Sequence, residues 1–254
     1  MAIDDAVVDV SQDWLQACSV QQRFMRRRAR NQCRVDYGAS CRQVRALGGD
    51  CYDFCCPTDG QLSMLVGDAS GKGVAAALMI ASVQASLRTA ALFTGSDLTA
   101  LLRVVNAQAC ASSLDDRYAT LFYSVLDQSA LTLRYVNAGH NPPIIFHPDG
   151  SVDWLEPSGA PVGLFPDATW QERVVPLRPG DRVIAYTDGV TEATSPSGEE
   201  WGLKGLLVAA NGRETESAEE LVQSILNSMD DFSSGVQTDD ATVAILRVLG
   251  QCAQ

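Results

Sequence analysis

Residues 65–73 read LVGDASGKG, and the apolar sequence AAALMIASVQ follows at residues 75–84. The hydrophobic run stops abruptly at Asp68, and a glycine-rich turn with one lysine leads into the apolar sequence. The pattern predicts a strand over 61–68 and a helix over 73–92 that is apolar on nearly all sides, so we expect this helix to be buried against a sheet. The turn between them presents two alternatives, a nucleotide-phosphate loop and a metal site at Asp68.

The nucleotide alternative depends on a strict spacing. A P-loop needs a glycine, four residues and then Gly-Lys-Ser/Thr, because the backbone cradles the phosphate and the hydroxyl binds Mg²⁺. Here Gly67 is followed by only three residues before Gly71 and Lys72, and Gly73 stands where the hydroxyl belongs. The loop is one residue short and lacks the metal-binding oxygen, so the sequence disfavours nucleotide binding.

The composition limits the function classes. The 254 residues are 46% hydrophobic and 20% charged, as in ordinary globular proteins. The net charge is −12, with +3 in residues 1–45 and therefore −15 in the remainder, which argues against nucleic-acid binding. No apolar run approaches the ~20 residues that span a bilayer, and the N-terminus MAIDDAVVDV lacks a secretory pattern. We expect a cytoplasmic protein that binds neither nucleic acid nor membrane.

The eight cysteines exclude two further classes. They form no Cys-x-x-Cys pair and the chain has two histidines, so zinc-finger spacing is absent. No cysteine is followed by arginine six positions later, as a cysteine-phosphatase loop requires. Cys51, Cys55 and Cys56 lie close to Asp50; we expect small buried side chains, and a redox-sensitive site is the alternative.

The remaining pattern indicates layers of strands and helices. Residues 157–166 and 195–202 read as loops, and Ser217 and Glu220 have the spacing of a capping box at a helix start. Strands grouped together, with helices inserted early and late, predict an α+β fold rather than an alternating parallel sheet. Further strands are expected at 119–127, 130–137, 143–147, 170–177, 181–187 and 241–248, and helices at 11–32, 97–113 and 217–230.

Aspartates lie beside the expected strands at four separated points. Singly, each of them reads as a turn residue. Together they would repel one another unless a cation neutralised them, and all-oxygen ligation favours Mg²⁺ or Mn²⁺ over zinc. The aspartates are Asp50 and Asp53 in GGDCYD, Asp68, Asp188 after VIAYT, and Asp239 and Asp240 before ATVAILRV.

The motifs that carry these aspartates form an ordered set over residues 45–249. The set resembles the bacterial PPM-type (protein phosphatase 2C-like) serine/threonine phosphatases that control sigma-factor partner switching and sporulation. The motifs are GGDCYD (48–53), GDASGKG (67–73), NAGHNPP (137–143), PVG (161–163), YTDGVTEA (186–193) and DDATV (239–243).

The resemblance implies a four-layer αββα sandwich, in which two antiparallel β-sheets are flanked by helices and a metal centre lies at one edge. The phosphatase domain would span 45–250, after a basic amphipathic helix and linker over 1–44. The helices at 73–92 and 97–113 stand where family members carry a pair that moves on activation.

The resemblance also implies the ligands of two Mn²⁺ or Mg²⁺ ions. Asp68 would bridge both ions, and the Ala69 carbonyl would bind one of them. Asp188 and Asp239 would complete the other, while Asp50 would bind directly or through water. The cations would lower the pKa of a shared water, which would attack the phosphorus of phosphoserine or phosphothreonine without a protein nucleophile.

Further residues of the motifs are candidates for supporting roles. Asp53 and Asp240 are expected outside direct metal contact or at the substrate, and Gly189 leaves room for close approach beside Asp188. Ser70 stands where eukaryotic relatives carry a histidine, a candidate acid for the leaving group.

The roles of two basic side chains in the motifs have two alternatives each. His140 reads as a turn residue near the site rather than a proton donor. Lys72 either attracts substrate phosphate near a helix N-terminus or is an exposed loop lysine.

The expected substrate is a phosphorylated anti-sigma-factor antagonist. A catalytically silent scaffold that binds regulatory partners is the alternative, and a small-molecule phosphoesterase shares the chemistry. No complete sensor domain fits ahead of residue 45, so we expect regulation by an activator protein, by a homodimer through the N-terminal helix, or by a longer protein of which this chain is a fragment.

Overall fold

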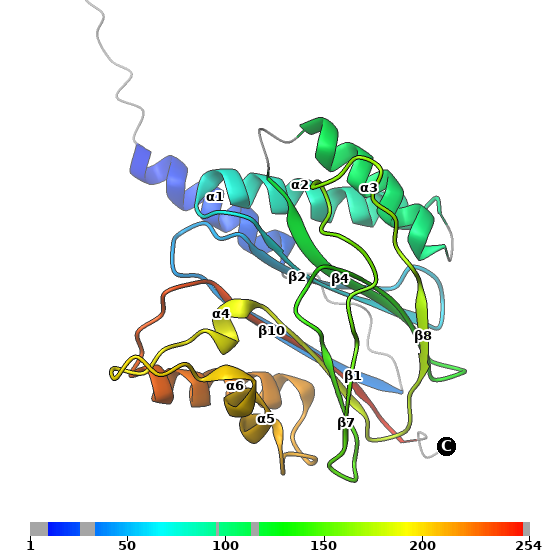
Figure 1. The fold of residues 1–254 in the computed structure, drawn as a ribbon, viewed down its shortest axis with the longest axis vertical. Helices are drawn as coiled ribbons and strands as arrows, with labels where there is room; N and C mark the ends of the chain where they lie inside the picture. The colour runs from blue at the N-terminus through cyan, green and yellow to red at the C-terminus, as the bar shows by residue number, and fades with distance from the viewer. Residues whose placement is uncertain (1–9, 26–33, 95–96, 113–116, 251–254) are drawn as a thin grey trace, which may run out of the picture.

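Two antiparallel five-stranded sheets lie face to face in the computed structural model, which describes residues 10–25, 34–94, 97–112 and 117–250 (Figure 1). The first sheet has the order β1 (Val35–Arg42), β10 (Ala241–Val248), β9 (Arg182–Tyr186), β6 (Ile144–Phe146) and β7 (Val152–Trp154). The second has the order β2 (Asp50–Cys55), β3 (Gln61–Ala69), β4 (Ala119–Asp127), β5 (Thr132–Ala138) and β8 (Arg173–Pro176).

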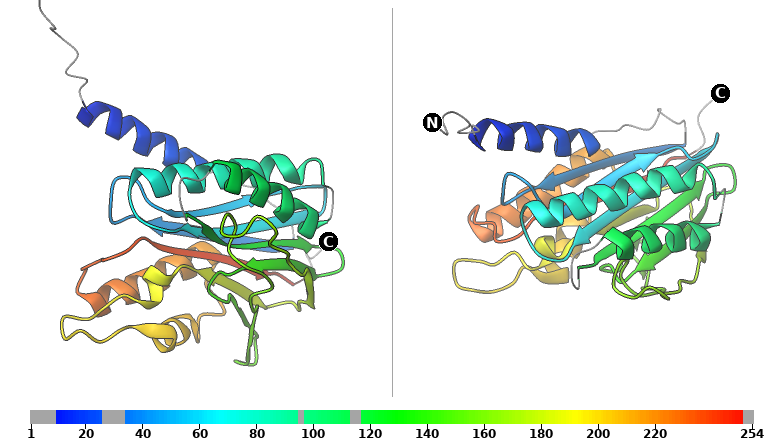
Figure 2. Two further views of the ribbon diagram at one scale, coloured as in Figure 1. Left: turned by 45° about the horizontal axis from the view of Figure 1, so that its top comes forward. Right: turned by 90° about the horizontal axis from the view of Figure 1, so that it is seen from above.

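Helices cover the outer face of each sheet (Figures 1 and 2). α2 (Val74–Ala91) and α3 (Leu98–Ser112) pack on the β2–β8 sheet, and α5 (Gly202–Ala210) and α6 (Ala218–Ser233) pack on the β1–β7 sheet. Three apolar layers result, one between the sheets and one under each pair of helices. The predicted αββα sandwich is therefore confirmed.

The period-two alternation of β3 divides its side chains between two of these layers. Val66 packs between the sheets, whereas Leu65 packs under the helices. Asp68 has the same parity as Val66, and Asp50 of β2 lies opposite Asp68 in the antiparallel register. Both carboxylates therefore belong to the face between the sheets.

Most of the expected elements are present. α2, α3 and α6 match the predicted helices, and Ser217 and Glu220 form the predicted capping box. α1 (Val10–Phe24) covers the first part of the helix expected at 11–32, and residues 26–33 of that prediction lie outside the described residues.

Some elements were not predicted. β1, β2 and β7 were missed as strands, and so were the helices α4 (Asp188–Thr191) and α5, which begins at the end of the expected loop 195–202. β1 lies inside the segment 1–44 that was assigned to a linker, yet all its residues pair with β10. The sheet therefore includes residues that precede the expected domain boundary at 45.

One helix of the described residues, α2, is long and apolar enough to cross a membrane by length and composition alone. Its buried residues, among them Ala76, Ile80, Val83 and Leu87, join the apolar layer over the β2–β8 sheet. α2 is therefore accounted for as a core helix of the sandwich, the role predicted for it.

Candidate metal centre

Four of the predicted aspartates meet where the two sheets come together at one edge. Asp50 and Asp68 lie opposite each other on β2 and β3 of one sheet. Asp188 is the first residue of α4, directly after β9, and Asp239 lies just before β10 of the other sheet. Segments far apart in sequence thus bring their carboxylates to a common place.

Asp50 is the most constrained of these carboxylates. It is 2% exposed, and its Oδ2 accepts hydrogen bonds from Thr187 Oγ1 at 2.7 Å and Thr242 Oγ1 at 2.6 Å. Both threonines belong to the opposite sheet, so the contacts fix the edges of the two sheets together. Burial, followed by the neighbouring Asp68, raises the pKa of Asp50 well above its ordinary value.

The pKa of Asp68 is raised by burial and by the neighbouring carboxylates. Burial, then Asp188 and Asp239, raise the pKa of Asp68 to about 7. Burial, then Asp239, also raise the pKa of Asp188. Grouped carboxylates with raised pKa values are stabilised by a nearby positive charge, and oxygen donors suit Mg²⁺ and Mn²⁺. The chemistry of this donor set fits divalent cations.

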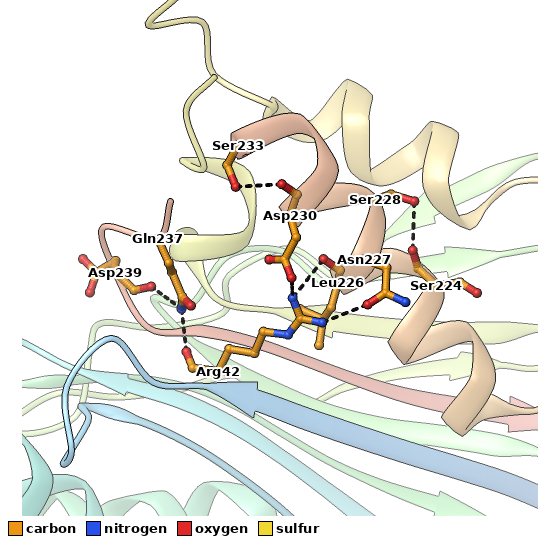
Figure 3. A network of polar contacts seen from close by, with 9 residues as sticks. All are labelled: Arg42, Ser224, Leu226, Asn227, Ser228, Asp230, Ser233, Gln237 and Asp239. Atoms are coloured by element: carbon orange, nitrogen blue, oxygen red, sulfur yellow. Dashed lines mark hydrogen bonds and ion pairs between the residues drawn. The ribbon is translucent and has the colours of Figure 1, made fainter. Parts of the chain in front are cut away.

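Asp239 is engaged by its neighbours. Its Oδ2 lies 2.7 Å from Lys72 Nζ, and its Oδ1 accepts a hydrogen bond from Asp240 N at 2.9 Å. Gln237 Nε2 donates to the backbone oxygens of both Asp239 and Arg42, at 2.7 and 2.6 Å (Figure 3). Within the described ranges, no three Asp, Glu, His or Cys side chains have the spacing of a finished metal site.

The Arg42 end of this network is attached to α6. The Arg42 guanidinium pairs with Asp230 and donates to Asn227 Oδ1 and Leu226 O (Figure 3). The strand β1, the helix α6 and the segment before β10 are therefore linked through one arginine and one glutamine. This linkage fixes the backbone that carries Asp239.

Asp240 organises the segment before β2 through its carboxylate. Its carboxylate accepts hydrogen bonds from Val44 N at 2.8 Å and Gly49 N at 2.9 Å. Gly189 makes close packing possible here, because a Cβ at that position would lie 2.0 Å from Asp240 O. The structure thus gives Asp240 and Gly189 positions that support the backbone around Asp50 and Asp188.

Asp53 lies on the other face of β2, three residues after Asp50. It is buried and pairs with Arg88 of α2, and Arg88 also donates to Phe24 O at the end of α1. The structure therefore does not bring Asp53 together with the other aspartates, because residues three apart on a strand face opposite sides.

Ser70 and His140 flank the cluster through backbone and side-chain contacts. Ser70 Oγ accepts a hydrogen bond from Tyr118 N at 3.0 Å, which fixes the loop after Asp68. His140 is 3% exposed, its Nδ1 lies 2.9 Å from Thr120 Oγ1, and burial lowers the pKa of its imidazole to about 4. The structure therefore places a neutral, enclosed imidazole at His140, and its structural role stays a prediction.

The cysteines near Asp50 have surroundings that disfavour thiolates. Cys51 is buried, and burial followed by Asp50 and Asp53 raises the pKa of its thiol well above the ordinary value. Cys55 Sγ lies 2.8 Å from Ser63 Oγ, and burial raises its pKa as well. Since a thiolate is the reactive form, burial disfavours reaction at these two thiols.

The sequence reading missed several residues that shape the site. Thr187 and Thr242 bind Asp50, and both stand in quoted motifs, directly beside Asp188 and two residues after Asp240. Arg117 and Arg45 have guanidinium nitrogens close to the loop glycines, 3.1 Å from a Cβ built on Gly71 and 3.5 Å from one built on Gly73. Their positions in sequence carried no signal for this proximity.

Comparisons with known proteins identify the family of this chain. Residues 58–249 match the family described as Stage II sporulation protein E (SpoIIE). Protein IcfG of Synechocystis is 30% identical over 237 residues, which cover 80% of this chain and 36% of IcfG. The phosphoserine phosphatase RsbU of Bacillus subtilis is 28% identical, with 91% of this chain and 68% of RsbU covered.

The fold has a solved counterpart in the SiaA-PP2C domain of Pseudomonas aeruginosa. The TM-score is 0.78 at 19% identity, over 94% of this chain and 96% of that domain. Fold and aspartate cluster together define the class, the PP2C-type (PPM) protein serine/threonine phosphatases. Within that class, the chain belongs to the family described as Stage II sporulation protein E (SpoIIE).

Proposed function

We propose that this domain hydrolyses phosphoserine or phosphothreonine in proteins with two divalent cations, Mn²⁺ or Mg²⁺. Asp68, the Ala69 carbonyl, Asp188 and Asp239 would hold the cations, with Asp50 as a direct or water-mediated ligand. The observation that carries the proposal is the convergence of Asp68, Asp188 and Asp239 from both sheets; burial, followed by Asp188 and Asp239, raises the pKa of Asp68 to about 7.

The donor chemistry and related folds support the cations. The PstP catalytic domain, which has this fold at a TM-score of 0.64, was solved in complex with two manganese ions. Bound cations would neutralise charge on the phosphoryl oxygens and make a water molecule more acidic. Thr187 and Thr242 donate to the Asp50 carboxylate and would keep it in one orientation when cations bind.

Two arginines beside the aspartate cluster, here called the phosphate-binding rim, support the proposal that the substrate is phosphorylated. Arg45 and Arg117 lie next to the loop 70–73 at the start of α2. Guanidinium groups bind phosphate well because their fork of donors matches its oxygens. These two side chains would orient the phosphoryl group toward the aspartate cluster.

We further propose that the substrate is a phosphorylated anti-sigma-factor antagonist in the cytoplasm. RsbU is a phosphoserine phosphatase by name, and a related structure joins the RsbU and RsbW domains of Rv1364c. Exposed Trp14, Leu15 and Val20 on α1 support an activator protein or a second copy of the chain binding there.

The test is hydrolysis of p-nitrophenyl phosphate and of phosphoserine peptides with Mn²⁺, with Asp68→Ala, Asp239→Ala and Asp59→Ala as variants. We expect the first two changes to lower kcat on the order of a hundredfold or more, and the exposed Asp59 change to have little effect. Inactivity of the unmodified protein with both cations, and with partners added, would favour the silent scaffold. Hydrolysis of small esters but not of phosphopeptides would favour the small-molecule phosphoesterase.

A further inference from the structure

Lys72 is attached to one of the candidate metal ligands. Its Nζ lies 2.7 Å from Asp239 Oδ2 and donates to Thr238 O at 3.2 Å. The side chain starts in the loop after Asp68 and is 50% exposed, so it reaches across the edge of the cluster from the solvent side. The proposed phosphate-binding role of a loop lysine does not explain these contacts.

Each carboxylate oxygen of Asp239 has one contact to a nitrogen. Oδ1 accepts a hydrogen bond from Asp240 N at 2.9 Å, and Oδ2 is bound by Lys72. Gln237 Nε2 donates to the backbone oxygen of Asp239, so the backbone that carries this carboxylate is held in place. A cation that approaches Oδ2 would therefore meet the positive charge of Lys72, and the cation and the ammonium would compete for the same oxygen.

The lysine is the easier of the two to displace. The Asp240 amide is held by the chain directly beside Asp239, whereas Lys72 has a flexible four-carbon stem and half of its surface in water. An exposed ion pair of this kind contributes only about 0–1 kcal/mol. Displacement of the ammonium would thus weaken cation binding by a modest factor and would not prevent it.

We propose that Lys72 is a built-in competitor for the cation that binds Asp239: the ammonium occupies Oδ2 until a divalent cation displaces it. This inference rests on the proposed function, since it assumes that Asp239 is a metal ligand. Lys72 thereby raises, by that modest factor, the cation concentration at which the site fills.

The chain supplies its own control, because Lys72 and Lys204 are its two lysines. Lys204 lies on α5 with an exposed side chain, on the far side of the β1–β7 sheet. Lys72→Met and Lys204→Met therefore change the net charge equally, and only the first frees Asp239. Lys72→Arg keeps the positive charge and the ion pair.

The test measures Mn²⁺ binding to the full chain by isothermal titration calorimetry, without any assay of activity. We expect Lys72→Met to bind Mn²⁺ about two- to fivefold more tightly than the unmodified protein, with Lys204→Met and Lys72→Arg close to the unmodified value. Equal or weaker binding by Lys72→Met would overturn the proposal, and so would equal tightening by Lys204→Met. If no variant binds Mn²⁺ at millimolar concentration, this proposal and the proposed metal centre both fail.

Acetylation of lysines, followed by mass spectrometry, observes the displacement directly. We expect saturating Mn²⁺ to raise the acetylation rate of Lys72 severalfold relative to Lys204 in the same molecule. An unchanged ratio, in a protein that calorimetry shows to bind Mn²⁺, would refute displacement while leaving the metal centre intact. Protection of Lys72 by inorganic phosphate with no effect of Mn²⁺ would assign it to substrate binding instead.

Discussion

Gln21 of α1 and Gly48, two residues before Asp50, share two hydrogen bonds: Gln21 Nε2 donates to Gly48 O at 2.7 Å, and Gly48 N donates to Gln21 Oε1 at 3.2 Å. Gln43 Nε2 adds a third contact to the same Oε1 at 3.0 Å. Because Gln21 and Gly48 are buried, these groups have little access to water. The N-terminal helix is thus attached to the segment that leads directly into the candidate metal centre.

We expect Gln21→Ala to lower the free energy of unfolding by about 1–3 kcal/mol, because it leaves the buried Gly48 amide and carbonyl without partners. Urea denaturation measures this change. The neighbouring Gln22 is exposed, so Gln22→Ala is a matched control on the same helix. Equal effects of the two substitutions would show that the contact to Gly48 contributes nothing specific.

The stability of the metal-free protein should depend on pH through Asp68. Its pKa rises from 3.8 to about 7 on folding, chiefly by burial and then by Asp188 and Asp239, so the folded state holds the proton more tightly than the unfolded chain. The contribution of Asp68 to stability is therefore complete at low pH and is lost as the pH rises toward and through 7.

Asp68→Asn cannot ionise and should escape this loss. We expect it to raise the free energy of unfolding by about 1–3 kcal/mol at pH 8, relative to the unmodified protein in EDTA, and to have much less effect at pH 4. Urea denaturation at both pH values measures the difference. A gain of the same size at both would contradict a raised pKa.

Mn²⁺ should stabilise the fold by binding the native state. At a concentration a hundredfold above Kd the stabilisation is about 2.7 kcal/mol, visible as a rise in Tm that EDTA reverses. Asp239→Ala should abolish most of this rise, whereas Asp59→Ala should keep it. The metal centre would be refuted by a Tm that does not respond to Mn²⁺ in the unmodified protein.

Asp53 should matter for stability more than for catalysis. It is buried against Arg88 on the face of β2 opposite to Asp50, and removing one member of a buried ion pair leaves the other uncompensated. We expect Asp53→Ala to cost about 2–4 kcal/mol, with kcat per folded molecule little changed. A loss of kcat as large as that of Asp68→Ala, in a protein of unchanged Tm, would place Asp53 in the reaction.

His140 should not shape the pH–rate profile. Burial lowers its pKa to about 4, so it is neutral throughout the range from pH 6 to 8. We expect the profile of His140→Gln to keep the form of the unmodified protein over that range, with a lower Tm because the contact to Thr120 changes. Disappearance of one limb of the profile would identify His140 as a proton donor.

The sequence by itself determined the parts of the fold that depend on local pattern. The apolar stretch after LVGDASGKG predicted α2, Ser217 and Glu220 predicted the start of α6, and the β-branched run ATVAILRV predicted β10. Periodicity and capping chemistry act over a few residues, so they are legible in the chain. β1 and β2 were not predicted as strands because their cysteines, aspartates and glycine lack that pattern. Pairing with β10 and β3 makes them strands.

Only the tertiary structure decided which aspartates share a site. Asp50 and Asp53 lie three residues apart in one motif, yet strand parity sends one to the cluster between the sheets and the other to Arg88. Asp239 and Asp240 are adjacent, yet one meets Lys72 and the other binds the backbone at Val44 and Gly49. The physical reason is that a carboxylate's role depends on what packing brings within a few ångströms of it, and that distance is set by the pairing of strands remote in the chain.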